Sequence, residues 1–268
     1  NFHGGHWLSA RAGTVYVPDL LAELAAAYGI PAAAFGEAFG SCHGFVLEDV
    51  ASFRQAVEPL SLAFLFDLVE SGGAIVARTR RGVAPVATVT LDDLAEEAGE
   101  AALVARTRAH ESELPRVARV SFIDSERAYQ AATVSAERLA TTARQVADAR
   151  LPVATDRARA QAIADAWLAD VWAGRETAAF ALPPSAAAVE PGDVVTLAVG
   201  GASRRYRVTA IGDGRARAVE AAAVAPDLET LQRVSPAPRA AAAAAGATAR
   251  PTAFGFPIDT MPIPNVDR

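Results

Sequence analysis

Hydrophobic and polar residues alternate with two different periods along this chain, and the change of period indicates where its parts begin and end. In the first part, apolar side chains such as those of segment 20–28 recur every three or four positions, which is the spacing of a helix with one buried face. From Pro115 the period is two, which is typical of strands with one buried face. The helical period returns once, in segment 155–174, so the sequence predicts a mixed α and β fold.

Two helices are predicted near the start of the chain. The first has Pro18 in its first turn and ends at Gly29, in agreement with the preferences of proline and glycine for these positions. Ser52 is expected to cap a second helix over residues 53–64 through its side-chain oxygen. Pro59 lies inside this segment and is expected to kink or split the helix.

A β-hairpin is predicted directly after the second helix. Segments 64–70 and 74–79 are strand-like, and Ser71-Gly72-Gly73 between them suits a tight turn because glycine tolerates positive φ. Other short elements are expected as strands at 45–47 and 101–109 and as a helix or turn at 91–94. Residues 1–112 therefore look like a small helix–helix–hairpin module.

The next part combines strands with one amphipathic helix. Strands are expected over residues 116–124, 129–138 and 144–153. The helix that follows has Thr155 as its predicted N-cap and Gly174 as its predicted C-cap. Trp167 and Trp172 on this helix would each bury about 150–250 Å². We therefore expect the helix to lie across a sheet or to close the end of a barrel.

Further strands follow the helix and complete the expected fold. Pro191-Gly192 suits a type II turn. Strands are expected over residues 178–182, 193–199, 204–211 and 215–224, the last three as a meander. Many short strands with one helix favour a small barrel or a strongly curled sheet. The expected class is α+β, with a helix-hairpin module at 1–112, a β-barrel-like domain with one amphipathic helix at 113–230, and an extended Pro/Ala-rich linker at 231–268 that leads to a following domain.

Composition narrows the possible functions. The chain has 268 residues and a net charge of −6, which argues against a general nucleic-acid binder with a basic face. All 25 basic residues are arginine, which excludes phosphate loops and catalytic steps that need lysine. The single cysteine, Cys42, excludes an internal disulfide, and no apolar run reaches the roughly 18 residues of a membrane span. The chain begins with Asn1, and we expect it to be a segment of a longer polypeptide.

One stretch, Gly40-Ser41-Cys42-His43-Gly44, matches a thiol version of the nucleophile elbow. That motif needs a strand before the nucleophile and a helix after it, whereas here a loop precedes the cysteine and a strand follows. A glycine-bordered loop is therefore the preferred interpretation. Cys42 and His43 could also bind a metal together with His3 and His6, but these residues do not form the four defined ligands of a structural zinc site.

Two further groups of charged residues are candidates for a catalytic or phosphate-binding site. A carboxylate pair, as in glycoside hydrolysis, could come from Asp124, Asp165, Glu190 or Asp193. Asp193 is instead expected to close the Pro-Gly turn, Asp165 is expected on the solvent face of the helix, and solvated surface is the preferred interpretation for the group.

A basic patch that contacts phosphates could come from Arg204, Arg205, Arg207, Arg215 and Arg217, with the first strand presenting Arg205 and Arg207 on one face and the next strand presenting Arg215 and Arg217. An exposed strand face or salt bridges between subunits are preferred, because the net charge is negative. The sequence thus predicts no catalytic, metal-binding or cofactor-binding residue and no cofactor.

An ordered set of motifs over residues 5–230 resembles one protein family. The motifs are Trp7-Leu8, Arg11-Ala12-Gly13, Gly44-Phe45-Val46, Glu58-Pro59-Leu60, Phe66-Asp67, Glu70-Ser71-Gly72-Gly73, Tyr129-Gln130, Ala162–Trp167, Phe180-Ala181-Leu182-Pro183, Pro191-Gly192-Asp193-Val194-Val195 and Tyr206-Arg207-Val208. Together they resemble the large baseplate hub ("megatron") protein of gene transfer agents and related siphophages. Ser41-Cys42-His43 departs from the plainer hydrophobic loop of that family, so the role of this loop is open.

This resemblance implies a structural role at the tip of a virion-like tail. Hub proteins of this type assemble as a homotrimer, continue the tail tube, pass DNA without binding it specifically, and contact the distal tail protein and other baseplate proteins. Contact with the host envelope would come through neighbouring domains. Larger members carry a glycosidase-like barrel domain, which would lie before this segment, and the family supplies no catalytic residue here.

Two alternatives stay open at this point. One is a cell-surface carbohydrate- or receptor-binding module of the tail tip, and the other is a cell-wall hydrolase that uses Cys42 and His43 or a carboxylate pair. For the hub itself, we expect the arginines of the meander to lie mainly at subunit contacts.

Overall fold

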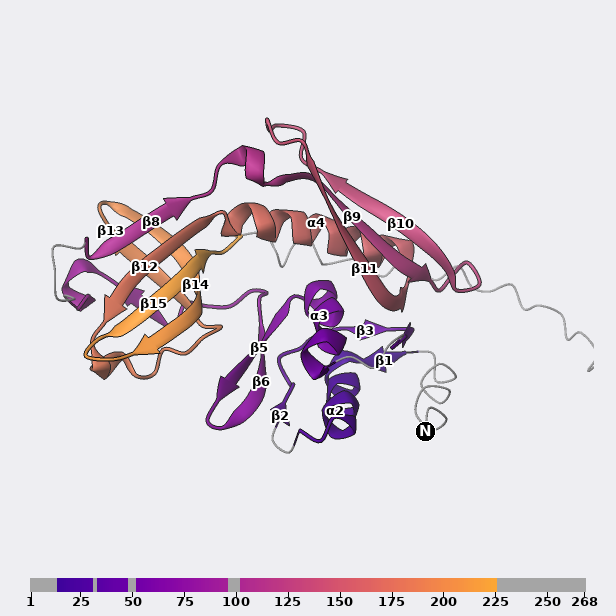
Figure 1. Cartoon of the computed structure of the whole chain (residues 1–268), viewed down its shortest axis with the longest axis horizontal. Helices are drawn as coiled ribbons and strands as arrows, with labels where there is room; N and C mark the ends of the chain where they lie inside the picture. Colours follow the sequence, from indigo (N-terminus) through magenta and orange to yellow (C-terminus); the bar gives the residue numbers. More distant parts are fainter. Residues whose placement is uncertain (1–13, 31–32, 48–51, 96–101, 226–268) are drawn as a thin grey trace, which may run out of the picture. The chain divides into compact units, whose positions relative to one another are not determined.

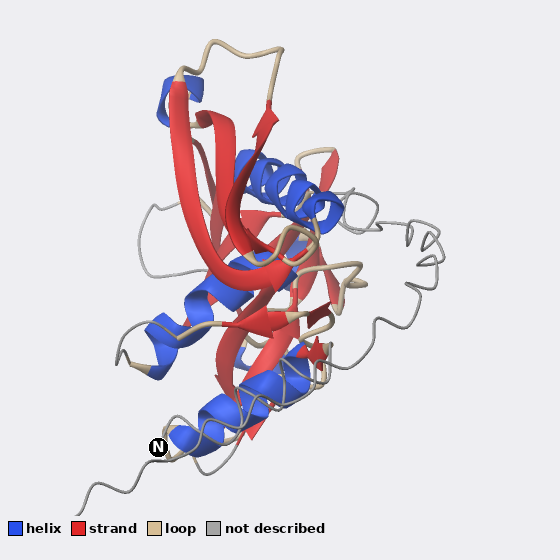
Figure 2. Cartoon of the chain, turned by 90° about the vertical axis from the view of Figure 1, so that its right-hand side faces the viewer, coloured by secondary structure: helices blue, strands red, loops and turns tan. Residues whose placement is uncertain are grey.

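The computed structural model describes residues 14–30, 33–47, 52–95 and 102–225 (Figure 1). These ranges contain both helices and sheets, so the predicted α+β class is confirmed, and Figure 2 shows the same mixture of elements. The described residues all fall within one compact unit, Asn1–Val234. The predicted linker at 231–268 therefore lies outside the described residues. The α-helices that the described ranges contain are α2 (Val17–Ala27), α3 (Phe53–Phe64) and α4 (Arg157–Gly174).

The two N-terminal helices begin and end where the sequence predicts. Pro18 lies in the first turn of α2, and Gly29 follows the helix with φ of 70°. In α3, the Ser52 hydroxyl accepts from the Gln55 N–H at 3.4 Å, and Gln55 Oε1 accepts from the Ser52 N–H at 3.0 Å, which forms a capping box. The helix continues through Pro59, so the predicted split is wrong.

The predicted hairpin is also confirmed. Strands β5 (Phe66–Ser71) and β6 (Ala74–Thr79) pair antiparallel, and the two glycines of the turn have φ of 58° and 77°. Strand β2 (Ala33–Ala34) extends this sheet by pairing parallel to β6. A separate two-stranded sheet pairs β1 (Val15–Tyr16) with β3 (Ser41–Cys42).

A four-stranded sheet packs against α4, the helix that contains Trp167 and Trp172. Its order is β10-β9-β11-β4, from strands Gln130–Glu137, Pro115–Asp124, Gln145–Thr155 and Gly44–Phe45. Helix α4 packs against β9 and β10, as expected for a helix that lies across a sheet (Figure 1).

The predicted caps of α4 are wrong. Asp156 is the N-cap, because Thr155 remains paired with Asp124 at the end of β11. At the other end, Gly174 is the last helical residue and Arg175 is the C-cap.

A six-stranded sheet contains the predicted meander. Its order is β7-β13-β14-β15-β12-β8, from strands Ala87–Val89, Val194–Val199, Ala202–Asp213, Arg217–Ala223, Glu176–Leu182 and Val104–Arg108. The two edge strands, β7 and β8, come from before residue 112, whereas the four inner strands follow α4. Short 3₁₀ helices lie at Leu91–Asp93, Glu111–Glu113 and Pro184–Ala186.

The barrel predicted for 113–230 is not confirmed. Its strands divide between the four-stranded and the six-stranded sheet, and neither strand order closes on itself within the described chain. The division of the chain into domains at 112 and 230 stays a prediction.

Two large hydrophobic cores and one small cluster support these layers. The larger one packs α2, α3 and α4 against the hairpin and the four-stranded sheet, with Leu21, Leu60 and Val120 among its fully buried side chains. The second lies on one face of the six-stranded sheet and includes Phe180 and Tyr206. Among the residues that the structure describes, no helix is long and apolar enough to span a membrane.

Candidate functional site

Four charged side chains form a cluster where the hairpin, helix α4 and the six-stranded sheet meet. We call this the junction cluster: Asp67 from β5, Arg80 after β6, Asp170 from α4 and Arg207 from β14. Arg80 forms a two-pronged contact with Asp67 and a second ion pair with Asp170 Oδ2 at 3.1 Å. Arg207 lies 3.5 Å from both carboxylates, through Nε to Asp67 and Nη2 to Asp170. Each acid thus contacts both arginines.

The charges of the junction cluster balance in a largely buried setting. Arg207 is only 9% exposed, and the side chain of Asp170 is 11% exposed. Burial lowers the pKa of Arg80, but the hydrogen bonds and negative charges of Asp67 and Asp170 outweigh it, so the net pKa is raised. The cluster therefore forms a charge-balanced connection between elements that are distant in sequence.

A second ionic contact attaches the hairpin to the Pro191-Gly192 turn. Arg78 donates to Glu37 at 3.0 Å and to Glu190 at 3.2 Å, and the Ser71 hydroxyl donates to Glu190 at 2.7 Å. Gly192 has φ of 92°, and a Cβ there would come within 2.9 Å of Arg78 Cγ. Glycine is therefore needed both for the turn and for the close approach of the hairpin.

Tyr206 anchors the six-stranded sheet from inside. Its hydroxyl donates to Glu176 at 2.5 Å, and Arg204 donates to the other oxygen of the same carboxylate at 2.5 Å. Desolvation, followed by the neighbouring Glu176 charge, raises the pKa of Tyr206 to about 12.

The raised pKa predicts a specific loss of stability at high pH. A group with a raised pKa stabilises the folded state fully below its unfolded pKa of about 10, and the contribution is lost as the pH rises through about 12. The free energy of unfolding of the wild type should thus fall more steeply between pH 10 and 12 than that of Tyr206→Phe, as measured by urea titration at each pH. Parallel pH profiles for the two proteins would refute this assignment.

The cysteine motif has no nucleophilic geometry. Cys42 is fully buried in the larger core, and desolvation by this burial raises the pKa of its thiol, which disfavours the reactive thiolate. The motif spans the short strands β3 and β4, without the strand-turn-helix that a nucleophile elbow requires. His43 Nδ1 instead lies 2.8 Å from the hydroxyl of Ser125.

The metal site considered from the sequence gains no support. No cluster of three His, Cys, Asp or Glu side chains suited to a metal occurs in ranges 14–30, 33–47, 52–95 and 102–225. His3 and His6 lie outside the described residues.

The candidate carboxylates have separate structural partners. Asp124 is 2% exposed and accepts from the Glu126 N–H at 3.0 Å, so the expected solvated position is wrong for this residue. Asp193 accepts from the Glu190 N–H at 2.9 Å, so it closes the Pro-Gly turn as predicted. Asp165 accepts from Gln161 at 3.1 Å, and Glu190 is held by Arg78 and Ser71. These contacts hold each of the four acids in its observed conformation.

Three members of the arginine group form ion pairs with acids of the same chain. Arg207 belongs to the junction cluster, Arg204 pairs with Glu176, and Arg217 pairs with Asp213 at 2.8 Å. Arg215 lies before β15 and not within a strand, because the hairpin turn is longer than the sequence suggests. The charge of Arg207 is matched within the chain, and the expectation that the meander arginines lie mainly at subunit contacts stays a prediction.

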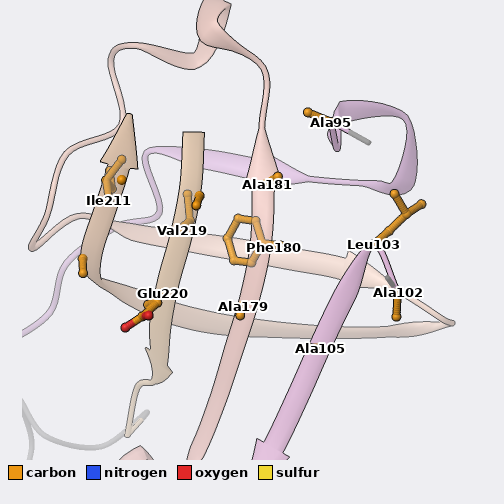
Figure 3. Close-up of a pocket in the computed structure, with 13 residues that line it drawn as sticks. Ala95, Ala102, Leu103, Ala105, Ala179, Phe180, Ala181, Ile211, Val219 and Glu220 are labelled. Carbon is orange, nitrogen blue, oxygen red and sulfur yellow. The ribbon is translucent and has the colours of Figure 1, made fainter. Parts of the chain in front are cut away.

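A groove of about 770 Å³ lies on the six-stranded sheet (Figure 3). Figure 3 shows Ala179 and Phe180 from β12 beside Val219 and Glu220 from β15. The lining consists mostly of alanine, and Glu220 is the single charged side chain among the residues that line it. The groove therefore lacks the paired acid and base, or the nucleophile, that a hydrolytic site would need.

Sequence reasoning did not identify the junction cluster. The sequence feature that best indicates the cluster is Asp170, an acidic residue among the buried positions at the end of α4. The partners of Asp170 are Arg80, which follows β6, and Arg207 in β14, and only the folded chain brings these segments together.

Comparisons of the chain with protein families and with solved structures both point to phage tail proteins. A family model described as "Putative phage tail protein" matches residues 52–211. The chain belongs to this family of phage tail proteins, and its location is accordingly the tail of a virion or virion-like particle. No curated protein matches the chain.

Solved structures add detail. A chain in the virion of a native gene transfer agent particle is 33% identical, with a TM-score of 0.77, and the match covers 85% of this chain and 52% of that one. This chain therefore spans about half the length of that relative. The tail protein of Neisseria meningitidis MC58 has a TM-score of 0.56 at 15% identity, covering 81% of this chain and 69% of that one. The 43 kDa tail protein of prophage MuSo2 from Shewanella oneidensis has a TM-score of 0.50 at 11% identity, covering 82% and 67%. The last two share the fold.

Proposed function

We propose that the chain is part of the central hub of a phage-like tail baseplate, of the gene transfer agent type, which continues the tail tube and lets DNA pass towards the host cell. The observation that supports this most strongly is the match to the gene transfer agent virion, at 33% identity over 85% of this chain. Similarity at this level over most of the described residues favours a position for this chain in its particle that matches the position of the related chain in the gene transfer agent virion.

The proposed hub is a homotrimer that contacts the distal tail protein and other baseplate proteins. In this proposal residues 1–112 and 113–230 act as two hub domains, and 231–268 leads to a following domain. The role is structural and not enzymatic, which is supported by the buried thiol of Cys42 and by the structural partners of the candidate carboxylates. Contact with the host envelope belongs to neighbouring domains.

The charge of the chain suits passage of DNA without retention. Each phosphate that a protein neutralises strengthens its binding to DNA, so a conduit is best left without free arginines. The net charge is −6, and Arg204, Arg207 and Arg217 are paired with acids of the same chain. A passing duplex would therefore meet few cations able to hold it.

The oligomeric state tests this proposal. Size-exclusion chromatography with light scattering should give three times the chain mass, and addition of distal tail protein should give a larger complex. The Arg144→Gln variant, which changes an exposed arginine outside the meander, serves as a control that should assemble in the same way. A chain that remains monomeric and does not bind the distal tail protein would contradict the hub assignment.

A further inference from the structure

A small pocket with two arginines in a partly apolar lining lies where the C-terminus of α3, the start of α4 and the Gly40-Ser41 segment meet. Its volume is about 230 Å³, and its lining includes Ser41, Phe64, Arg81, Thr155 and Arg159. Gly40 has φ of 137°, and a Cβ there would lie 2.4 Å from Phe64 Cδ1. The shape of this wall thus depends on glycine at position 40, and the stretch that resembles a nucleophile elbow forms one side of the pocket.

Arg81 brings a positive charge to this pocket without a carboxylate to balance it. Its Nη2 donates to the main-chain oxygens of Phe64 at 2.6 Å and Phe39 at 3.5 Å. Its Nε is buried and has no hydrogen-bond partner. Within the described residues, no ion pair involves Arg81, in contrast to Arg78 and Arg80 on the same segment. Burial lowers the pKa of Arg81, as expected for a cation that lacks a counter-charge.

Arg159 supplies a second guanidinium that is only loosely held. It lies 3.3 Å from Asp156 through Nε, and its Nη1 makes long contacts with the carbonyl and hydroxyl oxygens of Ser41 at 3.3 and 3.5 Å. Because Asp156 offsets one of the two positive charges, the pocket retains the charge of Arg81. The hydroxyls of Ser41 and Thr155 complete a set of donors around an uncompensated cation.

We propose that this pocket binds a single carboxylate, the side chain of an aspartate or glutamate from another protein subunit of the tail. The guanidinium fork matches the geometry of an oxyanion. Sites for small molecules usually begin near about 300 Å³, so a volume of about 230 Å³ suits one inserted side chain better than a metabolite. A DNA backbone presents rows of phosphates, which need more cations than this pocket offers, and the chain carries a net charge of −6. The identity of the donor as a tail subunit rests on the proposed function, whereas the carboxylate site does not.

The carboxylate site can be tested with acetate as the probe. We expect acetate to raise the unfolding temperature of the wild-type chain relative to chloride at equal ionic strength. Arg81→Gln should weaken acetate binding by about tenfold or more, because it removes a charge-assisted contact. Arg159→Gln, which keeps the bond from Arg81 to Phe64 that terminates α3, should also weaken binding. Arg205→Gln makes the same charge change on an exposed strand position and should bind acetate as the wild type does.

The possible outcomes test the carboxylate site and the tail subunit as its partner independently. No stabilisation of the wild type by acetate, or equal binding by all three variants, would overturn the site. Stronger stabilisation by inorganic phosphate than by acetate would assign the pocket to phosphates and overturn the carboxylate proposal. If Arg81→Gln loses acetate binding but enters tail particles as efficiently as the wild type, the subunit contact is wrong while the hub proposal stands. If the wild type binds acetate but enters no particle, the hub proposal fails and the site remains.

Discussion

Replacing Asp170 with alanine is expected to lower the free energy of unfolding by about 3–5 kcal/mol, which is a large part of the stability of a typical domain. Asp170 contacts both Arg80 and Arg207, and Arg207 is 9% exposed. Without Asp170, two largely buried guanidinium groups would share the single carboxylate of Asp67. The loss reflects the cost of leaving buried charges unmatched, and it exceeds the net contribution of the intact ion pairs.

Urea denaturation of the wild type and of Asp170→Ala would measure this difference. The matched control is Asp148→Ala, which removes an ion pair with Arg119 between side chains that are 63% and 51% exposed. That change should alter the free energy of unfolding by less than about 1 kcal/mol. Equal losses for the two variants would mean that the junction cluster is no more important than a surface pair.

Truncation of Trp172 is expected to cost about 3–5 kcal/mol in the free energy of unfolding. Trp172 is 5% exposed in the larger core, and its indole N–H donates to the carbonyl of Pro115 at 2.8 Å. The guanidinium groups of Arg138 and Arg175 lie 4.3 and 5.1 Å from its ring centroid. Trp172→Ala would therefore remove a packed ring, a hydrogen bond to β9 and two cation–π contacts together.

Trp167 provides the control from the same helix. It is only partly buried against the larger core, so Trp167→Ala should cost clearly less than Trp172→Ala in the same denaturation experiment. If Trp167→Ala lowers the free energy of unfolding more than Trp172→Ala does, the packing of Trp172 between α4 and β9 is not the main contribution of this helix to stability. The comparison also separates a local effect from a general loss of helix, because both substitutions raise helix propensity equally.

Local features of this fold were predictable, because they depend on residues close in sequence. Ser52 and Gln55 form the capping box of α3, and Gly72 and Gly73 form the hairpin turn, each within a few residues. The predicted N-cap of α4 is wrong for a non-local reason. Thr155 and Asp156 are both good N-cap residues, and only the pairing of Thr155 with Asp124 decides between them.

The arrangement of the sheets could not be predicted from periodicity. The strand pattern around residue 104 does not indicate that β8 will pair with β12, which lies some seventy residues later, because pairing over such distances depends on the whole fold. The same reasoning applies to Arg207. Its position on a strand suggested an exposed face, whereas Asp67 and Asp170 from two other elements meet it there. The site considered at Cys42 failed because its thiol faces the core, which a glycine-bordered motif does not reveal.

The central claim, that this chain is part of the hub at the distal end of a phage-like tail, is tested most directly by locating it in particles. Cells that produce the particle would carry the chain with an epitope tag, and purified particles would be labelled with gold-conjugated antibody and viewed by electron microscopy. We expect label at the tail tip, opposite the head, and no label on untagged particles. Label on the head, label distributed along the whole tail tube, or particles that contain none of the tagged chain would contradict the claim.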